Sequence, residues 1–204
     1  QLKNSAAQDQ AWDEAPLTEF AKNAFLRYQF DWSHQDTETM NTYMTPQYHY
    51  HASLLVYTLQ QLHRGNYISD IEIEEALISQ AHDSPDDAQD WFEVGFTARA
   101  NDVLVDNDAQ QTLFTDKNSF TEYWTFVRSG STWLIDGISQ ATADVSTYRG
   151  DIASFARQNG YKYSVDMGCL FIPKRGQLFG GAKFGTSDIN NHVVGMYKNI
   201  LVQL

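Results

Sequence analysis

The segment that most constrains this chain is residues 120–140, FTEYWTFVRSGSTWLIDGISQ. Two runs rich in aromatic and β-branched residues flank Ser129-Gly130-Ser131, which predicts a strand, a tight turn and a second strand. Side chains alternate along a strand, so the even-numbered residues of the first run share one face and the odd-numbered residues share the other. Because both faces carry bulky groups, we expect this hairpin to be central in its sheet and covered on both sides.

Helices are predicted ahead of the sheet. Over residues 16–32 apolar side chains recur every three or four positions, and Pro16 suits the first turn of a helix. A short helix is predicted over residues 37–44, with Asp36 or Thr37 as its N-cap.

A third helix is predicted to begin at Thr45 and Pro46. Thr45 suits the N-cap, and Pro46 suits the first helical position because its missing N–H has no partner there anyway. We expect Gly65 to end this helix, since glycine adopts the left-handed conformation without strain.

The first strand is predicted over residues 67–80, where isoleucines alternate with glutamates. If the alternation continues, Glu75 points inward together with Leu77. If a β-bulge interrupts it, Ala76 and Ile78 take the core side instead. The pattern is compatible with both arrangements.

An aspartate-rich loop, residues 82–90, follows this strand. It lacks the ligand order of an EF-hand, so we interpret it as a solvated hairpin loop and not as a calcium site. A second strand is predicted over residues 91–106, with a turn at residues 106–108. Helices first and an antiparallel sheet of hairpins afterwards predict the α+β class, with the helices packed on one face of the sheet.

The hairpin pattern E-x-W-T-F-x-R-x-G-x-x-W-x-[LI] resembles the Tim-forty-four-like family. That family comprises the C-terminal domain of the mitochondrial inner-membrane translocase subunit that tethers the import motor, and bacterial relatives. The likeness covers about residues 16–140 and includes FDWSHQDTETMNTYMTPQ and IEIEEALIS. It implies helices held in a strongly curved antiparallel sheet, the nuclear-transport-factor-two-like cone. It also implies a domain at a membrane that associates with anionic lipid and positions a chaperone.

Charge divides the chain into two regions. Residues 1–148 hold 7 Lys/Arg and 23 Asp/Glu, a net charge of −16, whereas residues 149–204 hold 7 and 3, a net charge of +4. The acidic region argues against a nucleic-acid partner, because phosphate contacts need clustered Lys and Arg. The acidic region is also at odds with the lipid binding that the resemblance implies, because an anionic bilayer attracts basic segments and not acidic ones. This shifts the weight to a protein partner.

The same shift in composition predicts three parts: a polar lead-in at 1–14, the cone domain at 15–142 and a second module at 150–204. We expect the second module to be smaller, β-rich and incomplete, since the chain stops at NILVQL within an apparent strand. Trp12 in the lead-in either docks on the domain or contacts a segment upstream.

No cofactor and no metal are expected. The glycine-rich run at 176–186 departs from the P-loop pattern, because Phe184 stands where Ser or Thr is required. His49 and His51 are two residues apart on a helix and point about 200° apart, so they cannot share a metal ion. Cys169 is the only cysteine, which excludes an intramolecular disulfide, and we interpret it as an inert buried thiol.

A cone fold can hold a concave pocket with an acid or base at its bottom. A buried carboxylate, Glu75 or Glu122, would then have a raised pKa and could act as a base. Alternatively, Glu122 and Arg128 form a structural ion pair or lie on a solvated face. The aromatic residues either fill the core or leave a cavity of lipid or peptide size. The pocket candidates are Phe25, Tyr28, Trp32, Tyr48, Glu75, Phe96, Glu122, Trp124, Phe126 and Arg128.

The leading functional hypothesis is a non-enzymatic binding or tethering domain of a membrane-associated protein of bacterial type. It would contact a protein partner or lipid and be anchored through a segment absent from this chain, on a side of the membrane that the sequence does not specify. The alternative is a small-molecule enzyme or carrier that uses the cone pocket. A third possibility is a structural module that presents the second module or forms a homodimer through the sheet.

Overall fold

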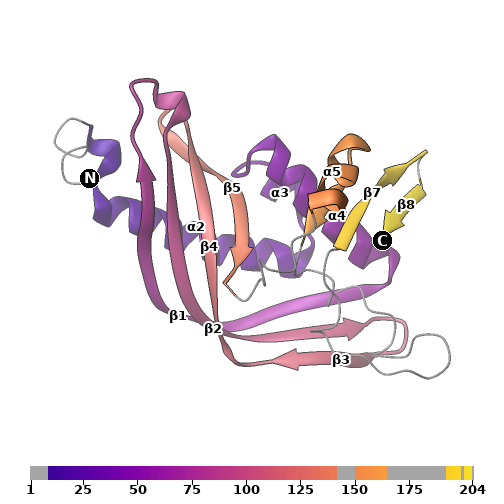
Figure 1. Ribbon diagram of the computed structural model, residues 1–204. Coiled ribbons are helices and arrows are strands. Elements are labelled where there is room, and N and C mark those ends of the chain that lie inside the picture. The colour runs from indigo at the N-terminus through magenta and orange to yellow at the C-terminus, as the bar shows by residue number, and fades with distance from the viewer. Residues whose placement is uncertain (1–8, 142–149, 165–191, 199, 204) are drawn as a thin grey trace. The chain divides into compact units, whose positions relative to one another are not determined.

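The computed structural model describes residues 9–141, 150–164, 192–198 and 200–203, shown as coloured ribbon in Figure 1. The chain separates into two compact units. The first contains residues 1–50, 67–102 and 116–141, and the second contains residues 51–66, 103–115 and 142–204. The predicted boundary at 142–150 falls mostly outside the described residues and stays a prediction. The glycine-rich run and Cys169 also lie outside them.

Helix α2, Glu14–His34, confirms the first predicted helix and extends it by two residues at each end. A 3-10 turn, η1 (Gln10–Trp12), precedes it. Of the apolar positions of its helical period, Leu17, Phe25, Tyr28 and Trp32 are buried, and Phe20 and Ala24 are half-buried. Gln35 ends the helix in the left-handed conformation, with φ of 55°.

Helix α3, Thr37–Met40, is shorter than predicted, and Asp36 is its N-cap. One carboxylate oxygen of Asp36 accepts from the Thr39 backbone N–H at 3.0 Å, and the other accepts from the Thr39 hydroxyl at 2.6 Å. Capping by Asp36 satisfies N–H groups that the first helical turn leaves without intrahelical partners.

Helix α4, Pro46–Gln61, begins as predicted, because the Thr45 hydroxyl accepts from the Tyr48 N–H at 3.2 Å. The predicted glycine cap is wrong: His63 takes the left-handed conformation, with φ of 53°, and Gly65 already belongs to strand β1 (Arg64–His82). Two contacts with the turn at residues 107–110 hold His63 there. Its Nδ1 lies 2.9 Å from Asp108 Oδ1, and its carbonyl accepts from Asn107 N–H at 2.8 Å.

The sheet of the first unit follows the order β1-β2-β4-β5, with β2 at Trp91–Asp106, β4 at Ser119–Ser129 and β5 at Thr132–Gln140. Strands β2/β4 and β4/β5 pair antiparallel, which confirms the predicted hairpin and gives an α+β fold. Strand β3, Gln111–Asp116, pairs with β2 and was not predicted. Figure 1 shows α2 crossing the strands on one face.

The hairpin is not central, because β5 ends the strand order. Instead of another strand, the segment before α4 covers its edge: Thr45 N–H donates to the Ile135 carbonyl, and Ile135 N–H donates to the Tyr43 carbonyl, both at 2.9 Å. Nor is β4 covered on both sides. Trp124 is fully buried, whereas Tyr123 on the opposite face is 38% exposed.

Strand β1 settles the two arrangements left open by its sequence. Ile71 and Ile73 are half-buried, but the next half-buried residues are Ala76 and Ile78, while Glu75 is exposed. The alternation therefore changes phase between 73 and 76, as the bulge alternative predicts. On the neighbouring strand β2, the alternate residues from Phe92 to Ala98 are all buried, as predicted.

The described residues of the C-terminal region form a helix and a small sheet. Helix α5, Gly150–Gln158, is followed by Gly160, whose φ of 70° is the left-handed conformation common after a helix. Strands β6 (Lys162–Ser164), β7 (His192–Tyr197) and β8 (Ile200–Gln203) pair antiparallel in that order.

Trp12 docks on the domain. It is fully buried, and its ring packs edge-on against Trp133 with centroids 5.2 Å apart. Trp133 in turn packs against Phe92 of β2 at 4.9 Å. The lead-in is therefore part of the core from at least this residue onward.

We expect Trp12→Ala to lower the free energy of unfolding by about 3–5 kcal/mol, because it removes a large buried ring. Trp12→Phe keeps a ring against Trp133, and no described residue accepts a hydrogen bond from Trp12 Nε1. Its cost should therefore be smaller, about 1–2 kcal/mol. Urea denaturation measures both variants. A Trp12→Ala protein as stable as the wild type would show that the lead-in does not dock.

Because His63 contacts Asp108, we expect the stability of the fold to depend on pH. The hydrogen bond that His63 donates to the Asp108 carboxylate, and then the negative charge of Asp108, raise the pKa of His63. Stability from this pair is therefore present below about pH 6.5, the pKa of an unperturbed histidine, and is lost as the pH rises through the pKa in the folded state.

A pH titration followed by NMR should show the pKa of His63 falling in Asp108→Asn. Asp83→Asn removes the same charge from the acidic loop and is the matched control. An equal shift in both variants would mean that net charge, and not the contact with Asp108, raises the pKa of His63.

Candidate functional site

The predicted pocket between α2 and the sheet is occupied by aromatic rings. Phe25 of α2 packs on Phe96 of β2 at 4.8 Å and on Trp124 of β4 at 5.1 Å between ring centroids. Tyr28 meets Trp124 edge-on at 5.2 Å. Phe25, Phe96 and Trp124 are fully buried. The structure thus brings these candidates together as mutual packing partners.

Other aromatic candidates extend the same packing. Trp32 stacks on Tyr28 at 6.0 Å, and Phe126 stacks on Phe92 at 4.9 Å. Tyr48 of α4 is half-buried and hydrogen-bonds the Tyr28 hydroxyl. Of the two functions considered for these residues, filling the core is the one that their contacts support.

The two glutamate candidates lie in different environments. Glu75 is exposed on β1 and lies outside the aromatic cluster, because the strand changes phase before it. Glu122 is 7% exposed and points to the side of β4 that carries Trp124. One of its carboxylate oxygens accepts from Trp124 Nε1–H at 2.9 Å, and the other accepts from the Gln140 side-chain amide.

The Glu122 carboxylate therefore links two strands, since Trp124 belongs to β4 and Gln140 to β5. Burial raises the pKa of the Tyr28 hydroxyl, and the negative charge of Glu122 raises it further. A general base needs a free path to the proton it removes. Here both carboxylate oxygens already accept protein hydrogen bonds, which favours a structural role for Glu122.

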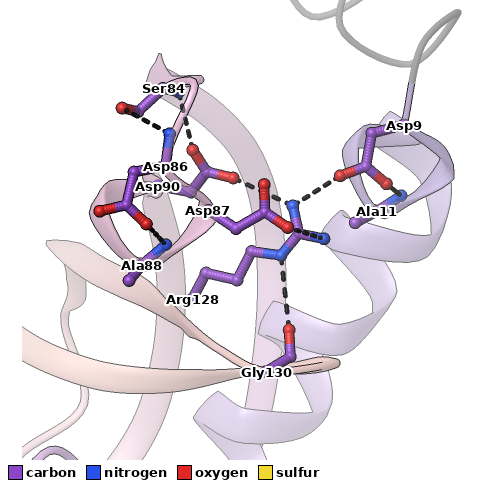
Figure 2. Close-up of polar contacts among 9 residues, drawn as sticks. All are labelled: Asp9, Ala11, Ser84, Asp86, Asp87, Ala88, Asp90, Arg128 and Gly130. Atoms are coloured by element: carbon purple, nitrogen blue, oxygen red, sulfur yellow. Dashed lines mark hydrogen bonds and ion pairs between the residues drawn. The ribbon is translucent and has the colours of Figure 1, made fainter.

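Arg128 does not pair with Glu122. Figure 2 shows it between Asp9, from the start of the described chain, and two aspartates of the loop after β1. Its guanidinium contacts Asp9 of the lead-in, Asp87 at 3.2 Å and Asp90 at 3.0 Å. The Arg128 side chain is 12% exposed and that of Asp90 is 0% exposed. This cluster ties the start of the chain, the loop after β1 and strand β4 together.

The interpretation of residues 82–90 as a solvated loop is confirmed for most of the loop, but not for Asp90. Asp87 is solvated, but the buried carboxylate of Asp90 also accepts from the Ser84 backbone N–H at 2.7 Å. The Ala11 N–H and then Arg128 lower the pKa of Asp9, and the bond with Asp9 raises the pKa of Arg128. Sequence analysis missed this site because Asp9 and Arg128 are 119 positions apart.

We expect Arg128→Ala to lower the free energy of unfolding by about 2–4 kcal/mol, because it leaves the buried Asp90 without its cationic partner. Arg99→Ala is the matched control: its partner Glu74 is 30% exposed, so the loss should stay below about 1 kcal/mol. Urea denaturation at pH 7 tests both variants. Equal losses would show that the cluster is no stronger than a surface ion pair.

The same cluster sets a pH dependence. The pKa of Asp9 is lowered in the folded state, so Asp9 contributes stability above its unfolded pKa, about 3.9, and that stability is lost as the pH falls through the folded value. The difference between Arg128→Ala and wild type should therefore shrink below about pH 4.

A second surface that the sequence did not reveal lies between α2 and β1. At one end, Ile68 N–H donates to the Ser33 hydroxyl at 2.9 Å. At the other end, Ala76 lines a shallow depression together with residues of the first half of α2. Between these two contacts, α2 presents Leu26, 42% exposed, and Phe30, 61% exposed. We call this surface the α2–β1 groove.

Within the part of the chain that the structure describes, no three His, Cys, Asp or Glu side chains are placed to hold a metal ion. His49 instead makes a 2.8 Å contact through Nε2 with the Thr37 carbonyl. None of the described helices is both long enough and apolar enough to cross a membrane.

No protein-family model and no curated protein matches this chain. Among solved structures, it is similar to the crystal structure of the intermembrane space region of the chloroplast protein ARC6. The two chains share 16% sequence identity with a TM-score of 0.47, over 60% of this chain and 95% of that chain. A similarity of this size carries no conclusion about function.

Proposed function

We propose that this chain is a non-enzymatic binding domain that holds a protein partner on its surface. The observation that carries this proposal is the aromatic packing of α2 against β2 and β4. Phe25, Phe96 and Trp124 occupy the region where a ligand pocket was predicted, with centroids 4.8–5.8 Å apart. A small-molecule site needs a concave cavity at its centre, and rings in contact do not leave one there.

Exposed apolar side chains on the outside support the same proposal. Leu26, Phe30 and Tyr67 are 42%, 61% and 46% exposed in the first unit. Apolar groups gathered on a surface are typical of protein contact sites. Leu26 and Phe30 are one helical turn apart, so they form a continuous stripe.

We further propose that the domain is of the Tim-forty-four-like type, with the cone arrangement and a tethering role at a membrane. The hairpin motif and the order of helices before an antiparallel sheet support this proposal. The net charge of −16 over residues 1–148 disfavours direct binding to an anionic bilayer and favours a protein contact. A second copy of the chain is one candidate for that contact.

The alternative, a small-molecule enzyme or carrier, has one observation in its favour. Glu122 is a buried carboxylate close enough to Tyr28 to raise its pKa. Pairs of buried titratable groups are common at catalytic sites. The hydrogen bonds from Trp124 and Gln140 to both oxygens of Glu122 weigh against this function.

Native mass spectrometry on gently purified protein distinguishes the two functions. We expect the mass of the polypeptide, alone or with a second polypeptide. A stoichiometric adduct of metabolite or lipid mass that disappears in Glu122→Ala would overturn the proposal. A folded Glu122→Ala protein, verified by circular dichroism, is required for that comparison.

A photo-crosslinking residue at Phe30 provides the positive test in living cells. We expect a discrete cross-linked polypeptide from this position and none from the control position Tyr50, which is 42% exposed on α4. Equal cross-linking at both positions would show that the contact is not specific to the α2 stripe.

A further inference from the structure

We propose that the free edge of β1, residues 71–82, binds an extended segment of the protein partner in which basic and apolar residues alternate. The segment would add a strand to the sheet and lie along the α2–β1 groove. This inference rests on the proposed function, because it specifies the partner that such a binding domain would hold.

The two edges of the sheet differ. At the β5 edge, residues 43–45 form backbone hydrogen bonds with Ile135. At the opposite edge, β1 is 19 residues long and, among the described strands, pairs only with β2. Figure 1 shows β1 as the outer strand beside β2. An unpaired strand edge exposes N–H and C=O groups that can bind another chain in extended conformation.

Helix α2 borders this edge. The Ile68 N–H donates to Ser33 of α2, so at this point the edge of β1 faces the helix. Asp70, with φ of 51°, then breaks the regular strand, and residues 71–82 follow. Further along, Ala76 shares a shallow depression with residues of α2, which are Glu14, Ala15, Thr18, Glu19 and Lys22.

Leu26 lies on the side of α2 that faces β1. It follows Lys22 by four positions and precedes Ser33 by seven, and both spacings return to about the same side of a helix. Phe30 continues the stripe one turn after Leu26, and its ring packs on His34 at 4.1 Å. The exposed apolar side chains of α2 thus stand between the two places where α2 meets β1.

The two faces of β1 specify two kinds of neighbour. Ile71, Ile73, Ala76 and Ile78 are half-buried on the inner face, and Glu72 is exposed on the outer face. Side chains of an added strand lie beside those of β1 on the same face. The added strand therefore carries apolar residues on the inner face, toward α2, and Lys or Arg on the outer face.

Charge supports a basic partner. Residues 67–90 contain eight Asp/Glu and no Lys/Arg. Glu74 is paired with Arg99, but neither Glu72 nor Glu75 has a salt bridge among the described residues. Nucleic acid and anionic lipid carry phosphates that this surface repels, so the complementary partner is a basic polypeptide.

The probe is a labelled synthetic peptide of about nine residues, alternating lysine and valine, which matches the length of an ordinary strand. Fluorescence anisotropy at low ionic strength measures its binding to the full chain. Two further peptides carry N-methyl groups on either the odd or the even residues. Because successive N–H groups of a strand point to opposite edges, one methylated peptide should bind about tenfold more weakly than the other.

Equal binding of the two methylated peptides would overturn strand addition and leave only charge attraction. A peptide that alternates glutamate and valine should not bind at all. Backbone amide shifts confined to β1 and α2 in NMR spectra should accompany binding of the parent peptide. Shifts elsewhere, without any in β1, would also overturn the proposal.

Protein variants test the groove itself. Leu26→Ser combined with Phe30→Ser should lower the affinity for the unmethylated lysine–valine peptide about tenfold, because apolar contact area is lost. Glu72→Gln with Glu75→Gln should weaken it at low salt and make binding less dependent on salt. The matched control is Tyr50→Ser, an equally exposed position on α4, which should bind as the wild type does.

The outcomes separate this inference from the proposed function. If no peptide binds but Phe30 still cross-links to a partner in cells, strand addition is wrong and the binding domain stands. If native mass spectrometry instead finds an adduct that depends on Glu122, the proposed function itself is wrong.

Discussion

The contact between α2 and the aromatic face of β2 and β4 is the interaction on which the first unit depends. Phe25 and Tyr28 both pack on Trp124, which is fully buried and donates a hydrogen bond to Glu122. Aromatic side chains bury more area than any others, so this contact sets the position of the helix on the sheet. It also supports the proposed binding function, because a space filled by rings leaves the outer surfaces to make contacts.

Charge is the second constraint. The chain holds 14 Lys/Arg against 26 Asp/Glu, and Arg128 alone engages three aspartates. By pairing with Asp9, Asp87 and Asp90, Arg128 joins distant segments of the chain and allows Asp90 to be buried. It also leaves the glutamates of β1 with few cations of their own. Arg128 thus holds the loop after β1, while the few basic residues near β1 leave its edge acidic, which is why we propose a basic partner there.

Some elements follow from local sequence alone. The bounds predicted for the strand at 91–106 are those of β2, and the hairpin turn at Gly130 was correctly placed. Local patterns predict such elements because side-chain periodicity and turn residues act over a few positions. The cap of α4 failed for the opposite reason: contacts of His63 with Asn107 and Asp108 outweigh the preference of Gly65 for positive φ.

The sequence by itself determined the α+β class, the helix over 16–32, the burial of alternate residues in β2 and the acidic character of the first 148 residues. These depend on periodicity and composition, which any chain reveals without its neighbours. Only the tertiary structure decided that Glu122 accepts hydrogen bonds from Trp124 and Gln140, and that Arg128 pairs with both Asp9 and Asp90. It also decided that β1 is an edge strand beside α2. Such pairings are set by which elements pack together, and residues far apart in sequence carry no local sign of them.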